Sequence, residues 1–165
     1  SYLFKCTVEE NLKMAKPDAT KEEMEAVLQK VNLLGFLQTQ DGLQTQLLEK
    51  ASNLSGGQCQ RLVIARALLR TDSAVYIFDE AASNIDVESE ELIMNVIHEL
   101  AKTKTVLLIS HRLANVVKSD KIYFLKDGEI KESGKHDELM SRNGAYRHLY
   151  ESQMALENYG KGGMA

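Results

Sequence analysis

Five consecutive residues, Leu54-Ser55-Gly56-Gly57-Gln58, stand at the start of an apolar run with helical spacing. The two glycines allow another molecule to approach the backbone closely, and Ser55 can both cap the helix and donate a hydrogen bond. The first turn of a helix carries unpaired N–H groups at the positive end of the helix dipole. We therefore expect this segment to bind terminal phosphate oxygens. A serine-capped turn alone would explain a bare Ser-Gly-Gly, but the full pentapeptide has a chance of only about one in several thousand in a chain of this length.

Two adjacent carboxylates, Asp79 and Glu80, follow the apolar run Ala74–Phe78. Such a run is typical of a strand buried on both faces of a parallel sheet, and ligands bind at the carboxyl ends of these strands. We expect Asp79 to hold Mg²⁺ through a water molecule and Glu80 to act as the general base toward an attacking water. The alternative is a strand that simply ends in two solvated carboxylates, because such strings are common.

A second apolar strand, Thr105–Ser110, places His111 at the same edge of the predicted sheet. A histidine there can contact a γ-phosphate and the water, and can sense the state of the site. The other histidines do not follow strands. His98 lies within a helix, His136 follows a glycine turn and His148 lies on the last helix, so we interpret all three as structural.

The hydrophobic pattern predicts a scaffold of alternating strands and helices around these side chains. Helices are predicted at Lys21–Leu34 (capped by Asp18 or Thr20), Gly56–Arg70, Asp86–Lys102, Leu113–Val117 and Ala145–Leu156. Strands are predicted at Ala74–Phe78 and Thr105–Ser110, with a hairpin formed by Lys121–Leu125 and Glu129–Glu132. Residues 38–53 are predicted to form a loop, and residues 158–165 a frayed tail. Apolar strands that alternate with helices indicate a parallel sheet in an α/β domain.

Composition narrows the possible functions. The chain has 165 residues, of which 44% are hydrophobic, enough for one domain with its own core. A net charge of −4 argues against a nucleic-acid partner. Cys6 and Cys59 have neither metal-ligand spacing nor a disulfide framework, which favours a reducing compartment. The apolar stretches are too short to span a bilayer.

The order of these motifs resembles the nucleotide-binding domain of ABC (ATP-binding cassette) transporters. Leu54–Gln58 matches the signature motif, Val75–Glu80 matches the Walker B strand, and His111 matches the switch histidine. Ser83-Asn84-Ile85-Asp86 stands at the D-loop, usually Ser-Ala-Leu-Asp, so that Ser83 and Asp86 agree and the middle residues depart. The segment 41–49 is similar to the pattern that precedes the signature in exporters, although Lys50 and Ala51 replace its usual Arg-Gly.

The resemblance implies a partial P-loop NTPase (RecA-like) core with parallel strands, at residues 71–157, plus an α-helical signature subdomain at residues 1–70. It implies ATP and Mg²⁺ as cofactors. Its functional unit is a head-to-tail dimer, in which Ser55, Gly56, Gly57 and Gln58 would contact ATP held by a second nucleotide-binding domain, a homo- or heterodimer partner. Glu80 and His111 would be catalytic, and Asp79 would be the Mg²⁺ ligand. Transmembrane domains would be the other partners, at the cytoplasmic face of the plasma (inner) membrane.

No Gly-x-x-x-x-Gly-Lys-Ser/Thr loop occurs in these 165 residues, and the Q-loop glutamine of the family would fall before Ser1. We therefore expect this chain alone to be inactive, and its two apolar strands to expose unpaired apolar faces. Two alternatives stay open. One is a non-catalytic module that supplies the signature in trans, and the other is an ABC-type ATPase without a membrane domain.

Overall fold

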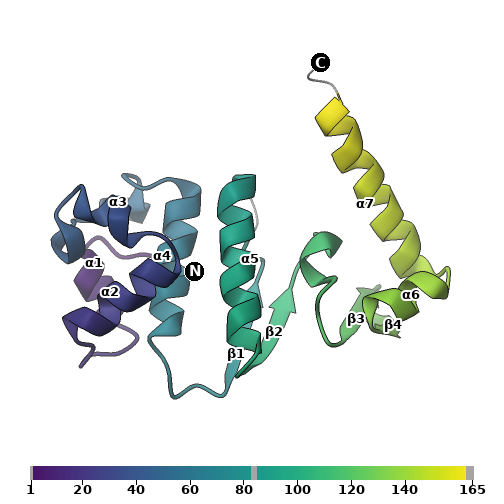
Figure 1. The fold of residues 1–165 in the computed structure, drawn as a ribbon, viewed down its shortest axis with the longest axis horizontal. Coiled ribbons are helices and arrows are strands. Elements are labelled where there is room, and N and C mark those ends of the chain that lie inside the picture. Colours follow the sequence, from purple (N-terminus) through teal and green to yellow (C-terminus); the bar gives the residue numbers. More distant parts are fainter. Residues whose placement is uncertain (1, 83–84, 163–165) are drawn as a thin grey trace. The chain divides into compact units, whose positions relative to one another are not determined.

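The computed structural model describes residues 2–82 and 85–162, with side chains up to residue 156. The chain forms two compact units, Ser1–Ile109 and Ser110–Ala165. The first unit begins with a helical part: α1 (Val8–Lys13), α2 (Lys21–Lys30), α3 (Leu34–Gln38), the short 3₁₀ helices η1 (Gly42–Gln44) and η2 (Glu49–Ala51), and α4 (Gly56–Leu68). It continues with β1 (Val75–Asp79), α5 (Val87–Ala101) and β2 (Thr105–Ile109) (Figure 1).

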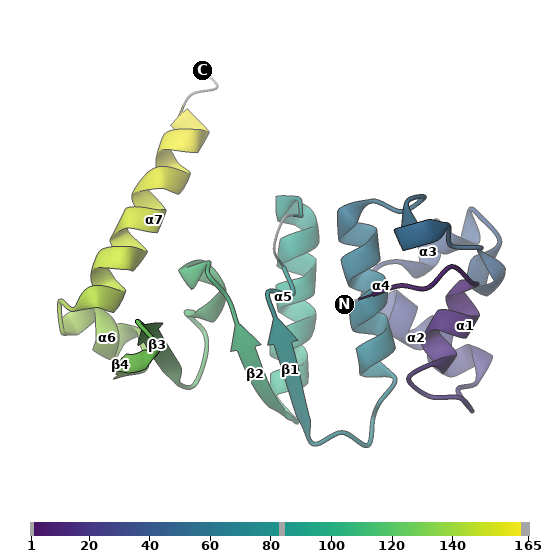
Figure 2. The same cartoon turned by 180° about the vertical axis from the view of Figure 1, so that it is seen from behind.

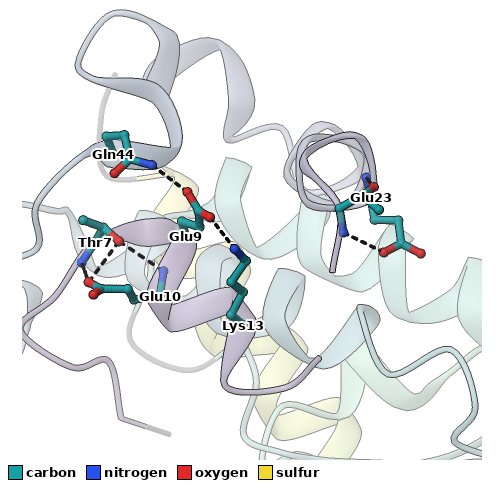
Figure 3. A network of polar contacts seen from close by, with 7 residues as sticks. Thr7, Glu9, Glu10, Lys13, Glu23 and Gln44 are labelled. Carbon is teal, nitrogen blue, oxygen red and sulfur yellow. Dashed lines mark hydrogen bonds and ion pairs between the residues drawn. The ribbon is translucent and has the colours of Figure 1, made fainter. Parts of the chain in front are cut away.

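Local side-chain caps define the starts of the first two helices. Thr7 and Glu10 form a reciprocal capping box on α1, since Glu10 N–H donates to Thr7 Oγ1 (3.1 Å) and Thr7 N–H donates to Glu10 Oε2 (2.8 Å). Glu9, the residue before Glu10, accepts from Gln44 of η1 and pairs with Lys13, so that one polar network ties α1 to η1 (Figure 3). Thr20 caps α2 in the same way as Thr7 caps α1, which confirms one of the two predicted caps.

The helical part has a core of fully buried leucines, in which α4 contacts α1, α2 and α5. Leu12, Leu28, Leu37 and Leu62 have no exposed surface. The helix predicted over Lys21–Leu34 ends earlier, at Lys30, and a separate helix, α3, begins at Leu34. The break occurs where Asn32 adopts a left-handed φ of 51°, which an asparagine tolerates better than most residues.

Strands β1 and β2 are parallel and in register from the Val75–Thr105 pair to the Asp79–Ile109 pair. Helix α5 connects them and contacts β2 (Figure 2). Burial on β1 alternates, because Tyr76 and Phe78 are buried whereas Ile77 is 65% exposed. The expectation that this strand is buried on both faces was therefore wrong for this chain. The exposed apolar face that we predicted is present, and its members are Val75, Ile77, Leu107 and Ile109.

The second unit contains a 3₁₀ helix, η3 (Leu113–Val116), the antiparallel hairpin β3 (Ile122–Lys126) and β4 (Glu129–Gly134), and the helices α6 (His136–Ser141) and α7 (Ala145–Gly162). Tyr146 at the start of α7 is fully buried, packs edge-on against Phe124 and bonds to His136 Nδ1 at 2.9 Å. Helix α6 was not predicted. Helix α7 continues to Gly162, beyond the predicted end at Leu156, so that residues 158–162 are helical. Residues 163–165 of the predicted tail lie outside the described residues.

Candidate functional site

The turn Ser55–Gln58 begins α4 and is organised by its own side chains. Ser55 Oγ accepts from Gln58 N–H (3.2 Å), and Gln58 Oε1 accepts from Ser55 N–H (2.9 Å). This capping box leaves the hydroxyl proton of Ser55 available as a donor. Leu54 is buried and anchors the turn, whereas Ser55 and Gly56 are exposed. The turn thus presents an exposed hydroxyl and an exposed helix N-terminus, a combination suited to a phosphate group.

Gly57 is the buried member of the turn, and it lies against the first turn of α5. A Cβ atom at Gly57 would be 2.3 Å from Ser89 Oγ and 3.1 Å from Asp86 Oδ2. These distances are shorter than van der Waals contact, so only glycine fits. The sequence suggested that Gly57 allows another molecule to approach the backbone. In the structure, Gly57 also allows the first turn of α5 to approach α4.

Asp86 is the N-cap of α5. With Ile85 it forms the part of the predicted D-loop that the structure describes, whereas Ser83 and Asn84 lie outside the described residues. Asp86 Oδ1 accepts from Ser89 N–H at 2.8 Å. This bond is the main cause that holds the pKa of Asp86 below its ordinary value, and the charge of Arg61 lowers the pKa further. Arg61 also donates to the carbonyl oxygens of Gly57 (3.3 Å) and Asn32 (2.9 Å). Arg61 therefore connects α4 with the turn after α2.

The carboxylates of Asp79 and Glu80 stand at the carboxyl end of β1, and both residues are exposed. Glu80 N–H donates to the carbonyl oxygen of Ile109 at 2.9 Å, which continues the pairing with β2 by one residue. Glu80 also has a φ of 49°, a left-handed conformation that is uncommon for a residue other than glycine. Strained backbone of this kind is concentrated at functional sites, and here it turns the chain sharply at the end of the strand.

Among the described residues, no three His, Cys, Asp or Glu side chains cluster closely enough to form a metal cage. Mg²⁺ usually takes one or two protein carboxylates and completes its shell with water and substrate phosphates. Asp79 is an oxygen donor of the right chemical type for this arrangement.

His111 follows β2 and belongs to the second unit, so its grouping with Asp79 and Glu80 stays a prediction. Ser110 and Gln153 bond to the backbone around it. The structural interpretation of His136 agrees with its bond to the buried Tyr146, and His148 is exposed on α7.

The sequence argument missed three residues that position the predicted ones: Ser89, Ser110 and Gln153. Ser89 follows the N-cap Asp86 by three residues, a spacing that indicates a local capping bond but not its contact with Gly57. Gln153 lies 42 residues from His111, and nothing in the sequence pairs the two.

Both cysteines are free, and burial raises the pKa of each thiol. No helix in the described part of the chain is both long and apolar enough to cross a bilayer.

Comparison with known proteins shows what this chain is similar to. Residues 2–83 match the family described as ABC transporter. The chain is 52% identical over 157 residues to an uncharacterised ABC transporter ATP-binding protein of Haemophilus influenzae, covering 95% of this chain and 28% of that protein. It is 44% identical over 154 residues to an ATP-dependent lipid A-core flippase of Mannheimia succiniciproducens, covering 92% of this chain and 26% of the flippase.

A solved structure of a bacterial Atm1-family ABC exporter with ATP bound superposes with a TM-score of 0.84 at 31% identity, over 93% of this chain and 27% of the exporter chain. The fold is therefore the α/β fold expected from the sequence, with parallel strands and a helical part. The chain spans about a quarter of the length of the relatives that it matches.

Proposed function

This chain belongs to the ABC transporter family, and we infer that it is part of the ATP-binding and ATP-hydrolysing domain of an exporter. That domain couples ATP binding and hydrolysis to transport across a membrane. The observation that carries this proposal is the capped turn Ser55–Gln58 at the start of α4, in which Ser55 and Gly56 are exposed. It has the shape and dipole needed for phosphate oxygens, and its sequence is the signature of the family. The names of the relatives, a lipid A-core flippase and an Atm1-family exporter, favour an exporter over an importer.

Each side chain has a role in this proposal that its chemistry supports. Ser55, Gly56, Gly57 and Gln58 contact the terminal phosphate of ATP held by a second domain. Glu80, at the strained end of β1, takes a proton from the attacking water as general base. His111 donates a hydrogen bond toward the γ-phosphate. Asp79 is the residue that would hold Mg²⁺ through water, and the ion would neutralise phosphate charge.

The proposed function includes two kinds of partner. A turn that grips only one side of the terminal phosphate needs a second nucleotide-binding domain to hold the rest of the nucleotide, and so a head-to-tail dimer is proposed. The transmembrane domains of the transporter are the other partners, and they place the domain at the cytoplasmic face of the membrane. Within the parent domain, we propose a boundary near residue 70 between the helical signature subdomain and the RecA-like core.

The test uses this 165-residue chain alone and mixed with a complete nucleotide-binding domain that carries Glu→Gln at its catalytic base. We expect neither ATP binding nor turnover from the chain alone, but ATP-dependent association in the mixture. Ser55→Arg places a bulky side chain where the phosphate would sit and should abolish the association. Ser152→Ala, an exposed change on α7, is the matched control and should leave association intact.

ATP turnover by the chain alone would refute the assigned site, because the phosphates would then be held by other residues. Association that is indifferent to ATP, or to Ser55→Arg, would refute the role of the signature turn.

A further inference from the structure

The backbone that carries His111 is held by two side chains, one local and one from a distant helix. Ser110 Oγ donates to the carbonyl oxygen of Arg112 and accepts from the N–H of Arg112, both at 3.1 Å. Gln153 Nε2 of α7 donates to the carbonyl oxygen of His111 at 2.7 Å, and Gln153 Oε1 accepts from the N–H of Leu113 at 2.9 Å. Every backbone polar group from the carbonyl of His111 to the N–H of Leu113 is therefore bonded to a side chain.

The bonds made by Gln153 replace a cap that the local sequence lacks. Helix η3 begins after Arg112, whose side chain makes no capping hydrogen bond. The N–H of Leu113, the first of η3, would otherwise be an unpaired donor. The amide of Gln153 satisfies this donor and the neighbouring carbonyl of His111 with one planar group, as an adjacent strand would.

Apolar packing holds α7 in place for this contact. Leu113 and Val116 of η3 are buried, and η3 contacts α7. Gln153 is itself half-buried, so its hydrogen bonds are partly shielded from competing water. With the backbone bonded on both sides of Arg112, the position of the His111 Cα atom is set.

We propose that Gln153 is a positioning residue, which fixes the backbone of His111 and so the direction in which its imidazole meets the terminal phosphate of ATP. This role rests on the proposed function, because it gives His111 a part in ATP turnover. It assigns a role in the ATPase cycle to α7, outside the motifs that the sequence indicated.

The first test measures ATPase kinetics of the full parent transporter with Gln153→Met, His111→Ala and the double variant. Methionine has similar length and flexibility but neither donates nor accepts strongly. We expect Gln153→Met to lower kcat by roughly fivefold or more, the lower limit that the loss of two hydrogen bonds implies, with little change in KM for ATP. In the His111→Ala background the same change should have no further effect, because Gln153 acts through His111.

Gln153→Glu provides a second variant on the same atoms. It keeps an acceptor for the N–H of Leu113 but replaces the donor to the carbonyl of His111 by a second oxygen, which repels that carbonyl. We expect a fall in kcat at least as large as that of Gln153→Met. Leu156→Ala, at a side chain that is 73% exposed on the same helix, is the matched control and should leave kcat unchanged. An unchanged kcat in Gln153→Met, or a further fall of the same size in the His111→Ala background, would overturn the proposal.

The second test separates this proposal from the proposed function. Amide hydrogen exchange of the parent, followed in peptides that cover residues 110–117, reports directly on the N–H of Leu113. Gln153→Met should speed exchange there and Leu156→Ala should not. Faster exchange in a parent that hydrolyses no ATP would refute the proposed function and retain the anchoring of the loop. Unchanged exchange in an active transporter would refute the anchoring itself.

Discussion

Replacement of Gly57 by alanine should separate the first turns of α4 and α5. The new Cβ would lie 2.8 Å from Ser89 Cβ, an atom fixed to the backbone of α5 that cannot rotate away. Because carbon atoms pack at about 3.5 Å or more, the two helix ends must separate by about 0.7 Å or distort locally. The shift would also disturb Asp86, whose Oδ2 lies 3.1 Å from the same point.

The expected cost follows from two opposing effects. Overpacking of a tight contact destabilises by about 1–3 kcal/mol. Alanine in place of glycine within a helix favours folding by up to about 1 kcal/mol. We therefore expect a net loss of about 1–2 kcal/mol in the free energy of unfolding. Gly35 of α3 is the matched control, because an added Cβ there meets no atom within 4 Å, and Gly35→Ala should be neutral or stabilising.

Equilibrium urea unfolding of Gly57→Ala, Ser89→Gly and the double variant measures this contact. Ser89→Gly removes the two atoms closest to the new methyl group but keeps the N–H that caps onto Asp86. The double variant should therefore be more stable than the sum of the two single changes predicts, by about 1 kcal/mol or more. If Gly57→Ala is as stable as Gly35→Ala, or if the two changes add without coupling, the inferred contact is wrong.

Three further outcomes are expected. The pKa of Asp86 is lowered in the folded chain, chiefly by the bond from Ser89 N–H. The ionised Asp86 therefore contributes to stability above an ordinary carboxyl pKa of about 4, and this contribution is lost as the pH falls through the lowered pKa. Melting temperatures between pH 2 and 6 should thus fall more steeply for the wild type than for Asp86→Asn, which caps without titrating; parallel curves would contradict this. Thr7→Ala should cost about 1 kcal/mol in thermal unfolding and Thr7→Ser much less, because serine keeps the capping box with Glu10. In the full parent, Glu80→Gln should lower kcat by about 100-fold or more while ATP binding persists, as expected for loss of a general base; near-normal turnover would exclude that role.

Several parts of the fold could be predicted because their causes are local. Helix α2 starts where Thr20 meets Glu23, and α5 starts where Asp86 meets Ser89, each within four residues of chain. The hairpin of β3 and β4 turns at Asp127-Gly128, where both residues adopt positive φ, as the Asp-Gly pair predicts.

Other parts could not be predicted, because they depend on what packs against them. The pattern of β1 indicated burial on both faces, but its Ile77 is exposed since the described chain covers only one face of the β1–β2 pair. Helix α6 has only six residues, too few for a clear period, and α7 extends past Leu156 through a polar segment that shows little amphipathic pattern.

The sequence alone determined the chemistry that this chain can offer. The capped turn Ser55–Gln58, the paired carboxylates Asp79 and Glu80, and His111 are each defined by residue type and by neighbours a few positions away. The tertiary structure decided how two of these groups are supported: Gly57 against Ser89, and His111 bonded to Gln153. Those contacts join residues more than 30 positions apart, and such pairs are selected by the packing of whole helices, which no local pattern encodes.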